Sequence, residues 1–67
     1  MSFGTVCTWN EERGFGFIKP DEGGADVFVH AKAIVGASML HPSQRVEYDA
    51  VFQPASGKYR ATDCRVI

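Results

Sequence analysis

The fold is decided by RGFGFIKPDEGGADVFVH, residues 13–30 of a 67-residue chain. Two short runs, FGFIK and DVFVH, alternate aromatic residues with glycine or with aliphatic and polar residues. Between them Pro20 stops the first run, and Gly23 and Gly24 tolerate the positive φ angles of a turn. One interpretation is a glycine-rich loop that cradles a phosphate group. The other is a pair of β-strands whose aromatic rings face water.

The phosphate-loop interpretation lacks the residues that it requires. GFGF does not match the G-x-x-x-x-G-K-[ST] pattern, and no helical pattern follows whose N-terminus could meet a phosphate. Strand alternation, in contrast, separates the side chains into two chemically consistent sets. The reversed arrangement would leave the aliphatic set exposed, so we favour the rings outward. The inward set contains Ile18, Val27 and Val29, and the outward set contains Phe15, Phe17, Phe28 and His30.

The remainder of the sequence predicts an all-β protein of one domain, residues 1–67. Alternation places Val46, Tyr48, Ala50 and Phe52 on one side of a half-buried strand. Five strands without a long helix predict a five-stranded antiparallel barrel, because closure removes exposed strand edges. Cys64 and Val66 are expected in its core. Strands are expected at residues 3–10, 15–19, 26–30, 45–53 and 58–66, with one helical turn at 31–34 and a loop at 35–43.

Size and composition argue against an enzyme. A chain of 67 residues has little room for both a core and an enclosed catalytic pocket. No G-x-S-x-G motif occurs, and the two cysteines and two histidines lack metal-ligand spacing. We therefore expect no catalysis, no cofactor, no metal and no small-molecule substrate. Without a long apolar run or a secretory signal, we expect a cytoplasmic protein with free thiols at Cys7 and Cys64 and no membrane partner.

The outward aromatic residues predict a binding surface. The net charge of -1 excludes tight binding of duplex phosphates by bulk charge alone. Contiguous exposed apolar surface usually marks a binding site, and flat rings stack on nucleobases with about 1–3 kcal/mol per base. Such stacking needs single strands, because the bases of a duplex are already stacked. A module that binds another protein through the same rings is the alternative.

The two runs resemble a known pair of motifs. RGFGFI and DVFVH are similar to the K-G-F-G-F-I and V-F-V-H motifs of the bacterial cold-shock proteins, and the length and the GTV start also fit. The resemblance implies an OB-fold barrel that binds single-stranded DNA and RNA and acts as an RNA chaperone. It places the stacking residues at Phe15, Phe17, Phe28 and His30. It also places Arg13 at a phosphate-binding position and Asn10 at the end of the first-strand motif.

Departures from the family pattern lie around the edge of this surface. The first strand usually reads K-W-F-N, whereas here it reads Cys7-Thr8-Trp9-Asn10, so that lysine and one ring are lost and Trp9 is expected to keep a ring. Ala31 stands where another phenylalanine is usual. The loop at 35–43 is about two residues shorter, with Met39 or Leu40 as partial substitutes for its ring. We therefore expect weaker or shorter-site binding than in a typical member.

The predicted contacts extend to the last strand. Lys58 and Arg60 lie on the strand that we expect beside the aromatic face, where a cation can meet a phosphate. Single-stranded DNA and RNA are the expected partners of a monomeric chain, with a dimer left open. The predicted nucleic-acid-binding residues are Trp9, Asn10, Arg13, Phe15, Phe17, Phe28, His30, Lys58 and Arg60.

Overall fold

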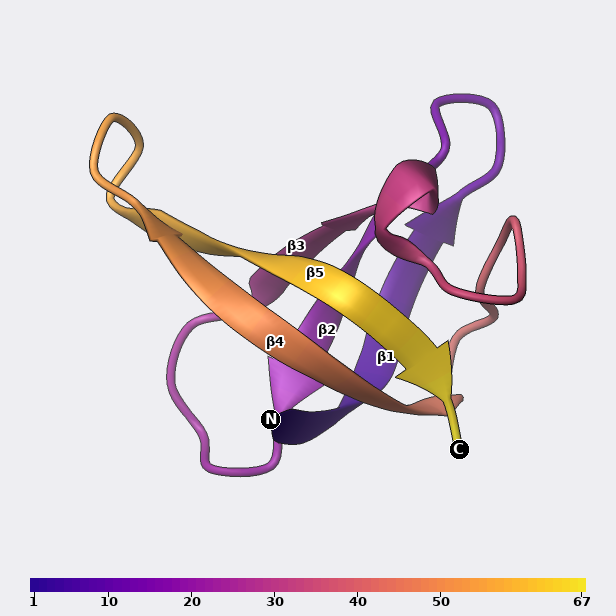
Figure 1. Cartoon of the computed structure of the whole chain (residues 1–67), viewed down its shortest axis with the longest axis horizontal. Coiled ribbons are helices and arrows are strands. Elements are labelled where there is room, and N and C mark those ends of the chain that lie inside the picture. Colours follow the sequence, from indigo (N-terminus) through magenta and orange to yellow (C-terminus); the bar gives the residue numbers. More distant parts are fainter.

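A computed structural model describes residues 1–67 as a small barrel of five strands (Figure 1). One turn of 3-10 helix, η1 (Ala31–Ala33), follows the third strand, and no helix is long and apolar enough to span a bilayer. The strands are β1 (Ser2–Asn10), β2 (Phe15–Pro20), β3 (Val27–His30), β4 (Arg45–Gln53) and β5 (Lys58–Val66). The predicted elements are thus confirmed, with boundaries that differ by one residue at most.

The strands close in the order β1-β2-β3-β5-β4. β1 pairs antiparallel with β2 and with β4, and so do β2 with β3 and β4 with β5. The ring closes differently from the prediction, because β3 and β5 run parallel and are paired only at Phe28 and Arg60. A second parallel bridge joins Ile34 to Cys64 just beyond η1. The all-β barrel is therefore confirmed, and its seam consists of two short parallel bridges.

The barrel interior is apolar and contains no buried charged side chain. The expected core positions Ile18, Val27, Val29 and Cys64 are each at most 3% exposed. Val66 was predicted to join them, and this is wrong, since its side chain is 44% exposed. Its strand has passed the last bridge to the β3 side at Cys64, so no element covers it. The remaining buried hydrophobic residues are Val6, Ile34, Leu40, Val46, Tyr48 and Ala61.

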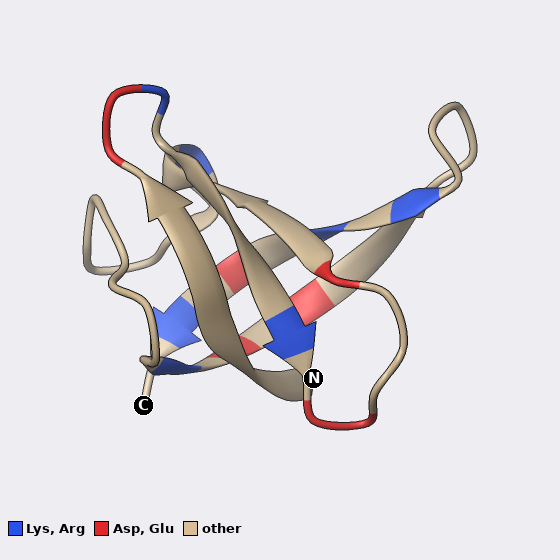
Figure 2. Cartoon of the chain, turned by 180° about the vertical axis from the view of Figure 1, so that it is seen from behind, with Lys and Arg blue, Asp and Glu red and all other residues tan.

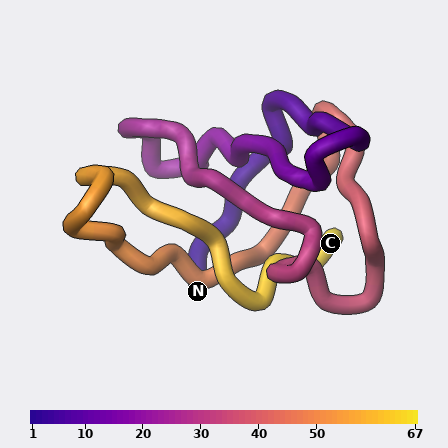
Figure 3. Tube along the Cα trace, turned by 90° about the horizontal axis from the view of Figure 1, so that it is seen from above, coloured from indigo at the N-terminus to yellow at the C-terminus, as the bar shows by residue number.

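The β4–β5 hairpin projects beyond the barrel (Figures 1 and 3, orange). β1 pairs with β4 only as far as the Ser2–Tyr48 pair, so later residues of β4 have no neighbour on that side. Val46 and Tyr48 are buried as predicted, but Ala50 and Phe52 are exposed. The prediction of a half-buried strand therefore holds only for its first half, because alternation does not show where the neighbouring strand ends.

An ion pair joins the start of β4 to the turn after β2. The Arg45 guanidinium donates to both carboxylate oxygens of Asp21, at 2.5 and 2.6 Å, and to the Thr5 hydroxyl at 3.1 Å. The hydrogen bond from Arg45 lowers the pKa of Asp21 below its usual value. The contact is exposed to water, so it orients the turn more than it stabilises the fold.

The Cys64 thiol makes stability sensitive to alkaline pH. Burial raises its pKa to about 11 from 9.0, and burial likewise raises the pKa of Tyr48. Since the folded state holds these protons more tightly than the unfolded chain, the free energy of unfolding should fall as pH rises from about 9 to about 11. The Cys64 contribution is at most about 3 kcal/mol. Urea denaturation across this range measures it.

The matched controls are the two cysteine variants. Cys64→Ala should reduce the alkaline loss of stability, whereas Cys7→Ala, which removes an exposed thiol, should leave it unchanged. An equal alkaline loss in the wild type and in Cys64→Ala would contradict this assignment.

Candidate nucleic-acid interface

Three phenylalanine rings and one imidazole form a continuous outward surface, which we call the aromatic platform: Phe15, Phe17, Phe28 and His30. Antiparallel pairing of β2 with β3 sets Phe15 opposite His30 and Phe17 opposite Phe28. The ring centroids of Phe15 and Phe28 lie 5.5 Å apart, and those of Phe17 and Phe28 lie 5.9 Å apart. Two of the three ring pairs are T-shaped and the third is tilted, so the rings pack against one another, and each phenylalanine is half-buried.

The opposite faces of the same strands are buried. Gly16 pairs with Val29 and Ile18 pairs with Val27, and all four residues are buried. The predicted arrangement, aliphatic inward and aromatic outward, is therefore confirmed. The part of each ring in nucleic-acid binding stays a prediction.

His30 is fixed by the turn that follows it. Its Nδ1 accepts a hydrogen bond from the Lys32 backbone N–H at 3.1 Å and so caps η1. In the neutral ring the proton must then be on Nε2. That N–H is directed away from the cap and is available to a ligand at the edge of the aromatic platform.

Cations lie along the β5 side of the aromatic platform. Arg60 is the partner of Phe28 in the parallel bridge and, with Lys32, lines a hollow of 500 Å³ beside Phe28 and His30. Lys58 lines a smaller hollow with Phe17. None of these three cations has a carboxylate within 4.0 Å. The structure thus brings the predicted Lys58 and Arg60 beside the predicted rings.

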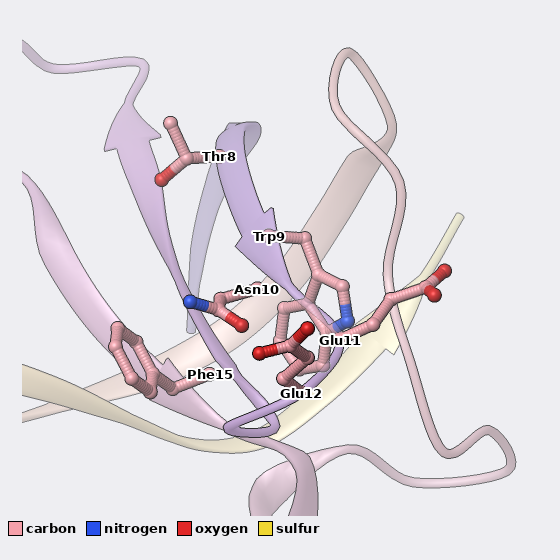
Figure 4. A pocket seen from close by; sticks show the side chains of 6 residues that line it. All are labelled: Thr8, Trp9, Asn10, Glu11, Glu12 and Phe15. Carbon is pink, nitrogen blue, oxygen red and sulfur yellow. The ribbon is translucent and has the colours of Figure 1, made fainter.

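The turn between β1 and β2 places negative charge at the other end of the aromatic platform. Its backbone is held by Asn10, whose Oδ1 accepts from the Arg13 N–H at 3.2 Å. Arg13 is exposed, but Glu11 and Glu12 precede it in the same turn (Figure 2). The two glutamates line a hollow that also includes Phe15 (Figure 4). A phosphate is therefore favoured on the β5 side and disfavoured at this end, where Arg13 alone offers a positive charge.

Trp9 lies on the other side of β1 from the position that alternation predicts. Val6 pairs with Ile18 but Thr8 pairs with Phe17, so a β-bulge at Cys7 shifts the register. Trp9 consequently pairs with Gly16 on the inward side and packs against the core. Its Nε1 is buried without a hydrogen-bond partner, and in Figure 4 its ring lies apart from that of Phe15. Strict alternation would place Trp9 on the side opposite the buried Val6, and this expectation is wrong because of the bulge. A binding role for Trp9 stays a prediction.

The residues around the edge explain what the platform lacks. Thr8 is exposed opposite Phe17, in the place where a ring would extend the stacking surface. Ala31 is half-buried, and its N–H donates to the Gly14 carbonyl at 2.8 Å. Leu40 is fully buried, so it does not replace the missing ring of the shortened loop, and Met39 is half-buried.

An exposed aromatic pair outside the predicted set lies on the projecting hairpin. The rings of Phe52 and Tyr59 are 5.2 Å apart and are 49% and 46% exposed. Alternation assigned Phe52 to the buried side and gave Tyr59 no role. The available signal was the absence of any charge from residue 50 to residue 57, which is unusual for an exposed hairpin.

Comparison with known proteins identifies the family. The family model described as 'Cold-shock' DNA-binding domain matches residues 2–67. The chain belongs to the cold-shock domain family. It is 49% identical to "Cold shock protein CspA" of Rhizobium meliloti (strain 1021), over 97% of each chain. It is 50% identical to "Cold shock-like protein CspE" of Escherichia coli (strain K12), over 69% of this chain and 70% of the relative.

A solved structure shares the fold of this cold-shock domain. The chain named "drosophila Unr CSD456" superimposes with a TM-score of 0.78 at 22% identity, over 98% of this chain and 26% of that longer one. At this level of identity the likeness establishes the barrel architecture alone. Members of the cold-shock domain family generally bind nucleic acids and are not enzymes.

Gly16 should tolerate no side chain. A Cβ atom there would lie 2.2 Å from the Thr8 carbonyl oxygen and 2.8 Å from Trp9 Cε3. Gly16→Ala should therefore lower the free energy of unfolding by about 2–3 kcal/mol, because the bulged strand cannot move away without leaving the core. Urea denaturation followed by far-UV circular dichroism measures the change. Thr8→Ala is the control, since it shortens an exposed side chain of the same residue and leaves the contacting backbone carbonyl in place. An unchanged stability in Gly16→Ala would contradict the close approach.

Proposed function

We propose that this cold-shock domain binds single-stranded DNA and RNA by stacking bases on the aromatic platform. The observation that carries the proposal is the packing of three half-buried phenylalanine rings on one outward face. The fold already holds these rings in place, so the protein loses little conformational entropy when a base stacks on them. Single strands are the ligand because their bases are free to leave one another.

Stacking supplies the affinity that net charge does not. The chain carries a net charge of -1, so phosphate attraction must come from local cations. Lys32, Lys58 and Arg60 line the hollows beside the rings, and none of them is in an ion pair. We expect the strand to run across β2 and β3 toward β5, away from Glu11 and Glu12.

The proposed activity is that of an RNA chaperone. Binding of transiently opened single strands competes with base pairing and melts weak secondary structure without ATP. This role suits a monomeric cytoplasmic protein, and it requires only modest affinity, so that each strand is released. The edge residues Thr8 and Ala31 lower the affinity further, since each is a place where a ring is missing.

Removal of two platform rings tests the proposal. Fluorescence anisotropy of a labelled oligo-dT or U-rich RNA at low salt should show binding by the wild type. The double variant Phe17→Ala, Phe28→Ala should bind about 100-fold more weakly, because two stacking contacts are lost. The control is Phe3→Ala, which removes a more exposed ring (44%) on β1, where Phe3 is paired with Glu47 of β4.

Circular dichroism must show that each variant remains folded. If the wild type binds no single strand at low salt but retains a protein ligand through the same rings, the chain is a protein-interaction module and the proposal is wrong. If Phe3→Ala weakens binding as much as the double variant does, the platform is not the binding surface.

Restoring a ring at Thr8 should strengthen binding. The side chain is exposed opposite Phe17, so Thr8→Trp adds a flat surface that continues the platform. One further stacked base corresponds to about a tenfold gain in affinity. Thr8→Leu is the matched control, because it adds apolar area without a flat ring. Equal gains from tryptophan and leucine would show that stacking is not the cause.

A further inference from the structure

The projecting β4–β5 hairpin has an aromatic face that the barrel does not need. Phe52 and Tyr59 are a cross-strand pair near its tip, with ring centroids 5.2 Å apart. They share a side of the hairpin with Ala50 and Ala61, because alternation along β5 places Tyr59 with the buried Ala61. Here, however, no further strand covers them, and almost half of each side chain faces solvent. The pair therefore contributes little to the core.

The seam of the barrel connects this pair to the platform. Before the Phe28–Arg60 bridge β3 and β5 are not paired, and two hollows lie between residues 24–26 and the hairpin. The hollow on the outer side is lined by Phe17, Ala25, Asp26 and Lys58. The hollow on the inner side shares Ala25 with it and reaches Tyr59, with Val27 and Ala50 among its other walls. A chain that leaves Phe17 along this path passes Lys58 and then meets Tyr59.

Lys58 is the cation on this path, and two carboxylates, those of Asp26 and Glu22, lie on the wall opposite the hairpin. No charged residue occurs between Asp49 and Lys58, so no carboxylate of the hairpin tip repels a phosphate. Lys58 and Arg60 lie on the outer side of β5 and are free of ion pairs. A nucleotide offers a partner to each of these side chains, because its flat base can stack on Tyr59 and its phosphate can meet Lys58.

We propose that Tyr59, supported by Phe52, is an additional stacking site for the terminal base of a single strand that continues past Phe17. Lys58 contacts the phosphate between the two sites. This inference rests on the proposed function and extends it, because the strand then occupies the hairpin as well as the platform. The binding site is thereby displaced toward β5, away from the β1 edge where Thr8 offers no ring and Glu11 and Glu12 carry negative charge.

A double-mutant cycle, in which a protein variant is combined with an altered oligonucleotide, tests the inference. Anisotropy is measured with oligo-dT of about eight nucleotides, with the same oligonucleotide carrying an abasic nucleotide at either end, and with oligo-dT of about four nucleotides. Tyr59→Ala should weaken binding of the long oligonucleotide about tenfold and leave the short one unchanged. One of the two terminal abasic changes should weaken wild-type binding by a similar factor. Combined with Tyr59→Ala, that change should have no additional effect.

Two control variants separate stacking from other causes. Tyr59→Phe keeps the ring and should retain the wild-type affinity and the dependence on the terminal base. Val51→Ala trims a side chain of similar exposure (42%) on the other side of the hairpin and should change neither. The loss of affinity caused by Tyr59→Ala should be the same at low and at high salt, because stacking is not a charge interaction.

Several outcomes would overturn the inference while leaving the proposed function intact. These are additive effects of Tyr59→Ala and the terminal abasic change, equal losses on short and long oligonucleotides, or no loss on either. A different result would assign the pair to self-association: the wild type sediments as a dimer, Tyr59→Ala sediments as a monomer, and the variant shows no coupling to the terminal base. Failure of the wild type to bind either oligonucleotide would overturn the proposed function itself.

Discussion

The close approach of β1 to Gly16 is the constraint on which the rest of the structure depends. The Thr8 carbonyl oxygen and the Trp9 ring occupy the space where any other residue would carry a Cβ atom. This contact allows the bulged end of β1 to cover the barrel and to turn the indole inward. Because Gly16 uses the inner side of β2, its neighbours Phe15 and Phe17 must face outward. Barrel closure and the aromatic platform are therefore two results of one packing requirement.

The small size of the barrel explains why its function belongs to the surface. Ten buried hydrophobic residues fill the interior, so no enclosed cavity remains for a substrate. The platform rings limit the cost of their exposure by packing against one another across β2 and β3. A flat apolar surface of this kind can bind a flat apolar partner with little rearrangement. The free cations on one side and the acidic turn on the other give the surface a direction.

The hairpin shows how a closed barrel can still offer an open strand pair. β4 and β5 extend past the first residues of β1 and β3, so the residues nearest the hairpin turn, at the end of β4 and the start of β5, are paired only with each other. Apolar residues placed there remain exposed even though their alternation is that of a buried strand. Phe52 and Tyr59 are thus available for contacts that the barrel itself does not make.

The sequence by itself determined the strands, the two faces of β2 and β3, and the family. These follow from period-two alternation and turn residues, which are local properties of the chain, and most of the platform could therefore be predicted. Only the tertiary structure decided the side of the sheet on which Trp9 lies, the exposure of Phe52 and Val66, and the parallel seam at Phe28 and Arg60. The first depends on a bulge within β1 that shifts its register against β2, and the others depend on where strands distant in sequence end. Alternation within one strand carries no information about these neighbours.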